Sequence, residues 1–193
     1  TYTPTSGTDR TASFTITGDQ DGLEVYGGFE NGDANLSDRN PTDHPVILSG
    51  DIGTLGDASD NSYHVLVFDG GNRIGPDMAP NVTPATVLDG VTITRGNANG
   101  SSDKVGGGLL CDGRGSGNEC SPTLVNVVFS NNAASVLGGA MFNDAFNGGL
   151  SSPVITNATF VENEATFDGG AIYNLGRQNG TSSPVITNAV FVG

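Results

Sequence analysis

The chain has 193 residues, of which 30 are glycine and none is tryptophan, and only 35% are hydrophobic. Its formal net charge of −14 argues against nucleic acid and against an anionic membrane surface as partners, because both are themselves negative. No apolar run approaches the roughly 18 residues that a transmembrane helix needs, so we expect no direct insertion into a membrane.

The first part of the chain, residues 1–85, alternates short apolar runs with long polar connections. The apolar runs are rich in β-branched and aromatic residues, which predicts strands rather than helices. The connections are rich in Asn, Asp, Gly and Pro, which is typical of surface loops. The strands are expected at 12–16, 23–26, 45–50 and 63–68, and the two longest loops between them at 31–45 and 50–61.

The loop at 49–61 is the best candidate for a metal site. It carries Asp51, Asp57 and Asp60 among glycines that allow tight curvature. Ca²⁺ takes six to eight oxygen ligands, and such a loop could wrap one ion. Asp outnumbers Glu 16 to 5 in the whole chain, which also suits ordinary turns. Calcium is therefore the one cofactor predicted, with a solvated acidic loop as the alternative.

The last part of the chain, residues 86–193, repeats itself every 31 residues. Two different modules keep this period, a Ser-Pro-led apolar run and a Gly-Gly pair. Self-similarity at 20–50 residues indicates a solenoid, a propeller or an array. The apolar runs lie at 121–129, 152–160 and 183–191, and the Gly-Gly pairs at 107–108, 138–139 and 169–170.

The period and its strand-like modules together predict an all-β protein, a right-handed parallel β-helix of about six coils. Long loops are expected on the N-terminal coils. Stacked coils would place equivalent residues above one another and so form side-chain ladders. The expected aromatic ladder is Phe129, Phe160 and Phe191, and the expected amide ladder is Asn126, Asn157 and Asn188. We expect a single domain over 1–193, cut from a longer chain.

One coil departs from the period. Residues 88–98 align with 124–134 at an offset of 36, five more than 31. We expect the additional residues in a surface loop at 97–104.

Cys111 and Cys120 lie nine residues apart, around a flexible, turn-rich segment. The two ends of that segment can approach within the roughly 4.4–6.8 Å between Cα atoms that a disulfide needs. A disulfide is predicted, with two free thiols as the alternative. A metal held by this pair alone is not expected, since no histidine or third cysteine is near.

The sequence gives little support for catalysis. His44 and His64 are isolated, and each is interpreted as structural. The seven basic residues are scattered, whereas an enzyme acting on acidic polysaccharides needs a basic or paired-carboxylate cleft. We therefore do not expect an enzyme. Of the five sequons, Asn157 is set apart because the amide ladder would use its side chain. The other four are candidates for glycosylation if the source modifies them: Asn35, Asn81, Asn99 and Asn179.

A family resemblance appears in the repeats. The segment Phe160-Val161-Glu162-Asn163, followed by Gly169-Gly170-Ala171-Ile172, resembles the paired F-x-x-N and G-G-A-I motifs of polymorphic outer membrane protein repeats. The resemblance is close over 86–193 and looser before it. It implies a secreted, pectin-lyase-like β-helix, extracellular or at the cell surface, within a longer chain.

The predicted function is a non-catalytic extracellular or cell-surface scaffold, such as a stalk, an adhesin or a filament segment. Its predicted partners are other copies through the coil ends, glycans or matrix components. The alternative is a calcium-dependent module that binds carbohydrate or cleaves polysaccharide. A glycan array with calcium present would discriminate between the two.

Overall fold

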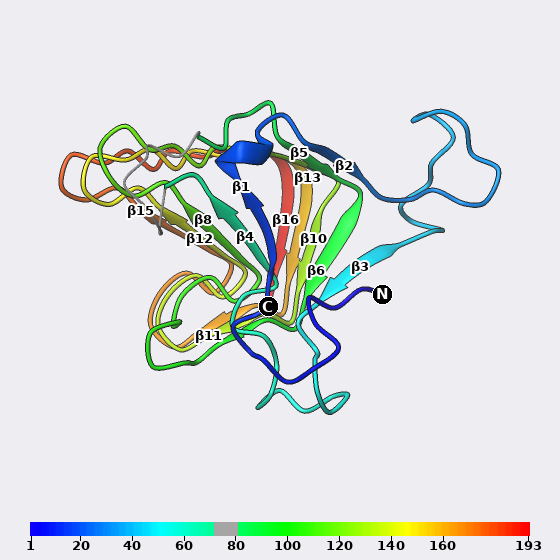
Figure 1. Cartoon of the computed structure of the whole chain (residues 1–193), viewed down its shortest axis with the longest axis horizontal. Helices are drawn as coiled ribbons and strands as arrows, with labels where there is room; N and C mark the ends of the chain where they lie inside the picture. Colours follow the sequence, from blue (N-terminus) through cyan, green and yellow to red (C-terminus); the bar gives the residue numbers. More distant parts are fainter. Residues whose placement is uncertain (72–80) are drawn as a thin grey trace.

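A computed structural model describes residues 1–71 and 81–193, and this part of the chain is all-β apart from one short 3-10 helix (Figure 1). The expected strands of the first part are present, each shifted by three residues or fewer at its ends. The elements are β1 Phe14–Thr17, η1 Gly18–Gln20, β2 Glu24–Tyr26, β3 Val46–Ser49, β4 Leu66–Asp69, β5 Val87–Asp89, β6 Val91–Thr94, β7 Asn97–Ala98, β8 Leu109–Asp112, β9 Thr123–Val125, β10 Val128–Ser130, β11 Ala133–Ala134, β12 Met141–Asp144, β13 Val154–Val161, β14 Glu164–Ala165, β15 Ile172–Leu175 and β16 Val185–Val192.

The strands form three parallel sheets. One sheet has the order β1-β4-β8-β12-β15, and a small one has the order β14-β11-β7. The largest sheet runs β2-β5-β9-β13-β10-β6-β3, with β16 added on β13. Every pairing of named strands is parallel, and each joins segments that are distant in sequence. The expectation of an all-β protein with parallel strands is confirmed.

The register of these pairs follows the period of 31 in the later repeats. Phe129 pairs with Phe160, which pairs in turn with Phe191. The ring centroids of the first two lie 5.0 Å apart and those of the last two 4.8 Å apart, with nearly parallel planes. Equivalent residues therefore stack at about the spacing of neighbouring strands.

The first Gly-Gly module, in contrast, is displaced by one residue. Leu109 pairs with Met141, at an offset of 32, and Gly106 shares the left-handed φ of Gly138. The equivalent pair is therefore 106–107 and not the predicted 107–108.

The additional residues of the irregular repeat lie where the sequence placed them. Asn97 still pairs with Ala133, at the offset of 36 that also separates Gly96 and Asn132. Val105 already bridges to Leu137, so most of the offset is lost between these two contacts. The one-domain organisation and its division at residue 85 stay predictions.

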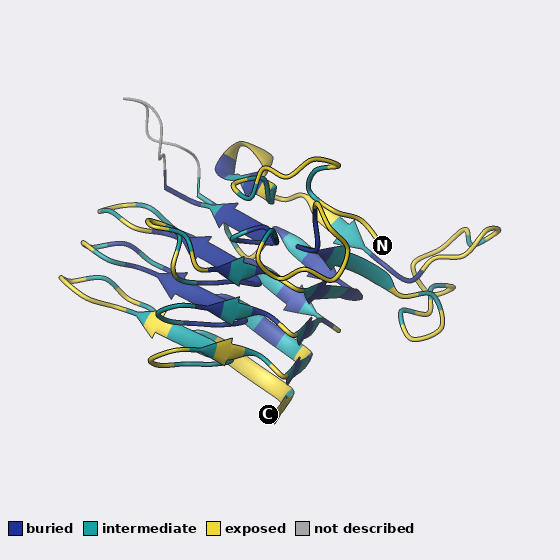
Figure 2. Ribbon diagram, turned by 90° about the horizontal axis from the view of Figure 1, so that it is seen from below, coloured by how far each residue is buried: buried dark blue, intermediate teal, exposed yellow. Residues whose placement is uncertain are grey.

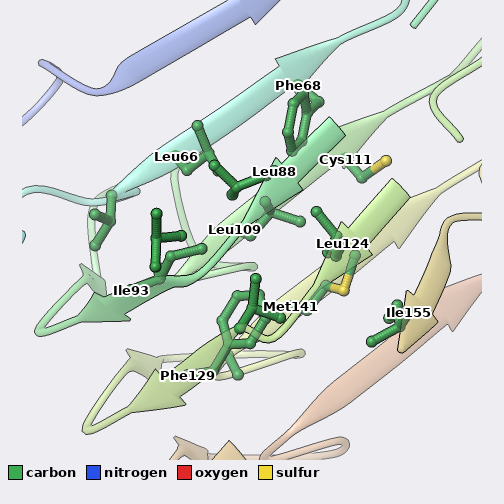
Figure 3. Packing of buried hydrophobic residues seen from close by; sticks show 14 of the residues in the cluster. Leu66, Phe68, Leu88, Ile93, Leu109, Cys111, Leu124, Phe129, Met141 and Ile155 are labelled. Carbon is green, nitrogen blue, oxygen red and sulfur yellow. The ribbon is translucent and has the colours of Figure 1, made fainter. Parts of the chain in front are cut away.

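The core is a column between the five-stranded and the eight-stranded sheets (Figure 3). Leu66 and Leu109 enter it from the first sheet, and Ile93, Leu124 and Phe129 from the second. Alternate residues of each strand face inward, which explains how a chain with few hydrophobic residues can still bury a continuous apolar row.

Glycine closes one corner of the repeat. A Cβ on Gly139 would lie 2.2 Å from the backbone oxygen of Glu164, so any other residue would force the chains apart. The preceding Gly138 has φ of +65°, a left-handed conformation that glycine adopts without strain. The Gly-Gly pair is thus required by the turn.

Burial falls toward β16 (Figure 2). Ile155 and Phe160 in β13 are 0% and 1% exposed, whereas Ile186 and Phe191 in β16 are 39% and 53% exposed. β16 is bonded along one edge only, so its inward side chains lack a neighbour on the other side.

We expect Phe160→Ala to lower the free energy of unfolding by about 3–5 kcal/mol, because it removes a ring packed on both faces. Phe191→Ala is the matched control and should cost about 1 kcal/mol, since this ring is half exposed. Urea unfolding followed by circular dichroism measures both. Equal losses at the two positions would contradict the stacking argument.

Candidate functional site

The expected amide ladder crosses the large sheet, with Asn126 between β9 and β10, Asn157 within β13 and Asn188 within β16. Asn126, Asn157 and Asn188 have φ of 51°, 56° and 53°, in the left-handed region that asparagine tolerates. The Nδ2 of Asn157 donates to the Oδ1 of Asn126 at 3.1 Å, and the Nδ2 of Asn188 donates to the Oδ1 of Asn157 at 2.6 Å. All hydrogen bonds of this ladder therefore point in one direction.

The ladder ends on an ion pair. The Nδ2 of Asn126 donates to Asp89 at 2.8 Å, and Arg39 forms a salt bridge with the same carboxylate. Both charged side chains are nearly buried, at 13% and 10% exposed. The guanidinium of Arg39 also lies over the ring of Tyr26, 4.9 Å from its centroid, and donates to the backbone oxygen of Gly27 at 3.2 Å.

Sequence reasoning missed this ion pair. The repeat alignment places Gly90 opposite Asn126, so the earlier repeat lacks the asparagine that would continue the ladder. The missing asparagine indicates that Asn126 must donate to another acceptor. Asp89, which directly precedes Gly90, is that acceptor. Nothing in the pattern identified Arg39, which lies 50 residues away.

Arg39 belongs to residues 28–45, which we call the strap. The strap joins β2 to β3 and projects from the sheets, at the right of Figure 1. Its two ends are tied together, because the backbone nitrogen of Asn40 donates to the oxygen of Gly28 at 2.6 Å. Inside it, Asp38 accepts hydrogen bonds from the backbone nitrogens of Ala34 and Asn35, and these lower the pKa of Asp38.

A groove of about 630 Å³ lies between the strap and the large sheet. The strap supplies one wall through Leu36, Pro41 and Pro45. Asn126 and Asn157 lie along its other side. The repeat pattern of the sequence did not predict this groove, because its wall is a loop that does not repeat.

A second amide ladder lies just after β10 and β13, where Asn132 is buried and Asn163 is partly buried. The Nδ2 of Asn132 donates to the Oδ1 of Asn163 at 3.0 Å and to the oxygen of Ile93 at 3.0 Å, while its Oδ1 accepts from Gly96. The Nδ2 of Asn163 donates to the oxygen of Phe129 at 2.9 Å. These are the last residues of the F-x-x-N motifs. They satisfy backbone groups at a corner, which makes their role structural.

The three carboxylates predicted to bind calcium have different partners. Asp51 forms a salt bridge with Arg95 and accepts from the backbone of Gly56 at 2.9 Å. The side chain and backbone of Ser59 lower the pKa of Asp57 by hydrogen bonding. Asp60 accepts from the backbone of Thr54 at 2.7 Å. Among the described residues, no group of three or more His, Cys, Asp or Glu side chains is placed to hold a metal ion.

Three consecutive residues of the same stretch carry a buried side-chain oxygen without a hydrogen-bond partner among the described residues. These oxygens are Asp60 Oδ1, Asn61 Oδ1 and Ser62 Oγ. The calcium site at Asp51, Asp57 and Asp60 stays a prediction. A melting temperature that does not change when a chelator is added would remove it.

A row of carboxylates lies on the five-stranded sheet. Asp69, Asp112 and Asp144 occupy equivalent positions at the ends of β4, β8 and β12. Arg114 bonds Asp112 through two nitrogens, at 2.9 and 2.6 Å, and its Nε lies 3.3 Å from Asp144. The hydrogen bond to Asp112 raises the pKa of Arg114. The guanidinium thus offsets the repulsion between stacked carboxylates.

The two histidines lie in different parts of the structure. His44 Nε2 is 3.4 Å from Glu30 in the strap. His64 is buried, with its Nδ1 at 2.9 Å from the oxygen of Gly106 and its Nε2 at 3.6 Å from Asp103. The structural role expected for each stays a prediction.

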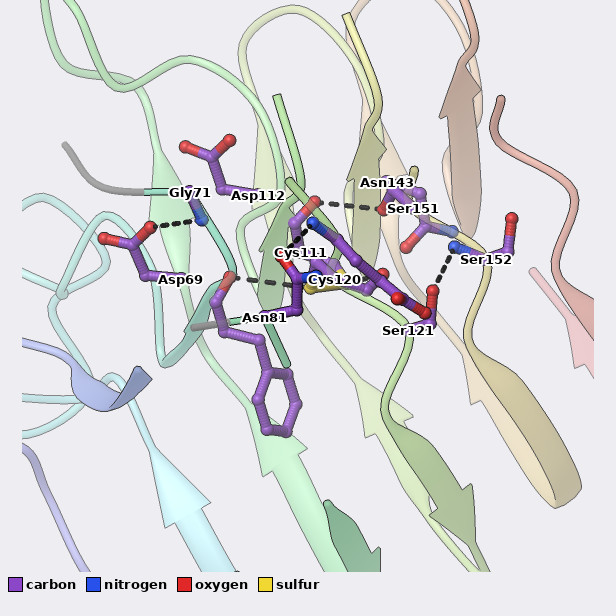
Figure 4. The surroundings of a disulfide bond; sticks show 12 residues. Asp69, Gly71, Asn81, Cys111, Asp112, Cys120, Ser121, Asn143, Ser151 and Ser152 are labelled. Carbon is purple, nitrogen blue, oxygen red and sulfur yellow. Dashed lines mark hydrogen bonds between the residues drawn. A yellow bond between two sulfur atoms is a disulfide. The ribbon is translucent and has the colours of Figure 1, made fainter. Parts of the chain in front are cut away.

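Cys111 and Cys120 form the expected disulfide, with Cα atoms 5.6 Å apart (Figure 4). Cys111 pairs in register with Asn143, whose Nδ2 donates to the Oδ1 of Asn174 at 2.8 Å. A covalent bond in one repeat therefore occupies the position that amides occupy in the next two. No free cysteine is present in the described part of the chain.

The four sequons differ in what their side chains do. Asn35 and Asn179 are exposed. The Oδ1 of Asn81 accepts from the backbone of Glu119 at 2.9 Å, and the Oδ1 of Asn99 accepts from Arg10 at 2.7 Å. Glycosylation at these sites stays a prediction.

Comparison with known proteins gives one match. Residues 157–175 match the Chlamydia polymorphic membrane protein (Chlamydia_PMP) repeat, a stretch that contains the F-x-x-N and G-G-A-I motifs. No curated protein and no solved structure matches the chain significantly. In the described ranges, no helix is long and apolar enough to cross a membrane.

We expect the ion pair of Arg39 and Asp89 to stabilise the fold chiefly because each nearly buried charge neutralises the other. Arg39→Met should lower the free energy of unfolding by about 3 kcal/mol, because it leaves the Asp89 carboxylate unpaired. Adding Asp89→Asn should recover most of that loss, since an amide at this position still accepts from Asn126. Urea unfolding of both single variants and the double variant measures the coupling.

Additive losses in the double variant would contradict this account. Arg177→Met serves as a control for the substitution itself, because Arg177 is exposed and its side chain makes no hydrogen bond or ion pair with the described residues.

Proposed function

We propose that the chain is a segment of a β-helical solenoid that serves as a non-catalytic scaffold outside the cell or at its surface. The observation that carries the proposal is the in-register stacking of equivalent residues across successive repeats, from Phe129 to Phe160 to Phe191. In a solenoid each coil contacts only its neighbours, so length can be added without changing the core.

The arrangement of basic residues supports a non-catalytic role. Arg39 and Arg95 are each paired with one carboxylate, and Arg114 lies between two. Arg10 lies over the ring of Tyr63, 4.3 Å from its centroid, and donates to backbone oxygens. None of these four guanidinium groups is free to hold the carboxylates of an acidic polysaccharide.

The family match and the disulfide support a location outside the cytoplasm. The matched repeat is named for a membrane protein family. Disulfides form and persist in oxidising compartments such as the cell exterior. An acidic surface also keeps a long, thin protein soluble.

The free edge of β16 supports association end to end. Its unpaired backbone is a template for strand addition, and Val190 and Phe191 are each 53% exposed. The added coil can come from a second copy of the chain. Sedimentation velocity over a range of concentrations measures this, and a species that stays monomeric throughout would contradict it.

Deleting one full period should preserve the fold. Removing residues 132–162 joins Asn131 to Asn163 and keeps the F-x-x-N motif, so β15 and β16 can stack on β8, β9 and β10. We expect cooperative unfolding at a somewhat lower temperature, and a particle shorter by about 4.8 Å in small-angle scattering.

The control is removal of residues 132–146, about half a period, which puts every later residue out of register. We expect this variant not to fold. If the full-period deletion is equally unfolded by circular dichroism, the repeats are not the independent units that the proposal requires.

Surface location is tested on the organism that makes the protein. Antibodies raised against the purified chain should label intact cells or the surrounding medium. Labelling that appears only after the cells are lysed would rule out the proposed location. Incubation with neutral and acidic polysaccharides should release no new chain ends, and cleavage of any of them would overturn the non-catalytic assignment.

A further inference from the structure

The groove under the strap stands out because it carries no free charge. The chain has 21 acidic residues, yet among the residues that the structure describes no carboxylate lines this groove. Arg39 is the one charged lining residue in the described ranges, and its guanidinium is already paired with Asp89. A ligand that complements this surface is therefore uncharged.

The groove also offers hydrogen-bonding groups that the protein does not use. Thr42 and Thr92 line it, and their hydroxyls make no hydrogen bond with the described residues. Asn126 and Asn157 each use one N–H and accept one bond within the ladder, which leaves one N–H and one lone pair on each amide. These donors and acceptors face a ligand side by side, at intervals of one strand spacing, about 4.8 Å.

Apolar surfaces alternate with these polar groups. Leu36 is 51% exposed, and it lines the groove together with Pro41, Pro45 and Val128. A ligand therefore meets neutral polar groups and apolar patches together. A sugar ring has this character, because its hydroxyls project from the rim while its faces carry C–H groups.

The wall of the groove is fixed before any ligand arrives. Arg39 holds the strap to Asp89 and Gly27, and the hydrogen bond from Asn40 to Gly28 closes its base. Pro41 packs so closely on Gly28 that a Cβ there would lie 2.5 Å from the Pro41 nitrogen. A preformed site loses little affinity to ordering on binding.

We propose that this groove binds a neutral glycan chain that lies along the ladder of Asn126 and Asn157. An extended peptide fits less well, because peptides commonly add to the open edge of a sheet, whereas this groove lies over the bend between paired strands. The proposal adds a binding site to the scaffold and does not depend on the location of the protein.

The test is titration of the whole chain with three neutral hexasaccharides, β-1,4-glucan, β-1,3-glucan and α-1,4-glucan, followed by calorimetry. At least one should bind saturably. Acidic hexagalacturonate should bind at least tenfold more weakly, since the groove has no free cation to attract it. An uncharged peptide of six alternating Thr and Val residues is the competing probe.

The variants Thr42→Val and Thr92→Val remove the two free hydroxyls with little change of shape. Each should weaken glycan binding roughly threefold to tenfold, as expected for the loss of one hydrogen bond. Thr166→Val is the matched control, because this threonine is exposed, lies outside the groove and should not change the affinity. Melting temperatures close to that of the unaltered chain verify that all three variants are folded.

Three results would overturn the proposal. They are no saturable binding of any neutral hexasaccharide, tighter binding of hexagalacturonate or of the peptide, or unchanged affinity in both groove variants. The period deletion and the surface labelling test the scaffold separately, so failure here leaves that proposal standing.

Discussion

Parallel backbone pairing in strict register is the constraint on which the rest of this structure depends. Because β13 pairs in register with β16, from Val154 with Val185 to Val161 with Val192, each side chain lies beside its equivalent 31 residues away. A phenylalanine must then stack on a phenylalanine, and an asparagine must donate to an asparagine. A residue inserted within a strand would move the side chains that follow it in that strand to the opposite face. The core thus requires register between paired strands, while loops such as 97–104 absorb differences in repeat length, from an offset of 31 between β10 and β13 to one of 36 between β6 and β10.

Stacking like on like favours amides and aromatics over charges. An asparagine can donate to the copy on one side and accept from the copy on the other, so the ladder of Asn126, Asn157 and Asn188 satisfies itself internally. Stacked carboxylates repel each other, and the row formed by β4, β8 and β12 accordingly has Arg114 beside it. Because every hydrogen bond of the ladder is donated in the same direction, the last amide needs an acceptor beyond the ladder. A carboxylate is a stronger hydrogen-bond acceptor than a neutral group. Asp89 fills that role and in turn needs the cation that the strap provides.

The correct predictions from the sequence come from the repeats and from local composition. The all-parallel strands, the disulfide between Cys111 and Cys120 and the extra residues at 97–104 were all readable, because each depends on local composition or on comparison of one repeat with the next. The contact of Arg39 with Asp89 and that of Arg95 with Asp51 were not, since these pairs are 50 and 44 residues apart and depend on the path of a single loop. A loop that occurs once in the chain cannot be aligned with another repeat, so its contacts cannot be inferred by comparison. The groove was missed for the same reason, because its wall is the strap.

The residues of the stacked repeats are constrained by the fold, whereas most residues of the strap can be replaced. Replacing a residue of the stacked column disturbs the neighbour on each side, as the position of Phe160 between two other rings shows. The strap has no counterpart in later repeats, and beyond its attachment through Arg39 and Pro41 its residues contribute little to the core. Leu36, Thr42 and Pro45 could therefore change without loss of the fold, while the amide ladder beneath them could not. A regular amide ladder beside a variable wall is an arrangement in which selectivity can be altered independently of stability.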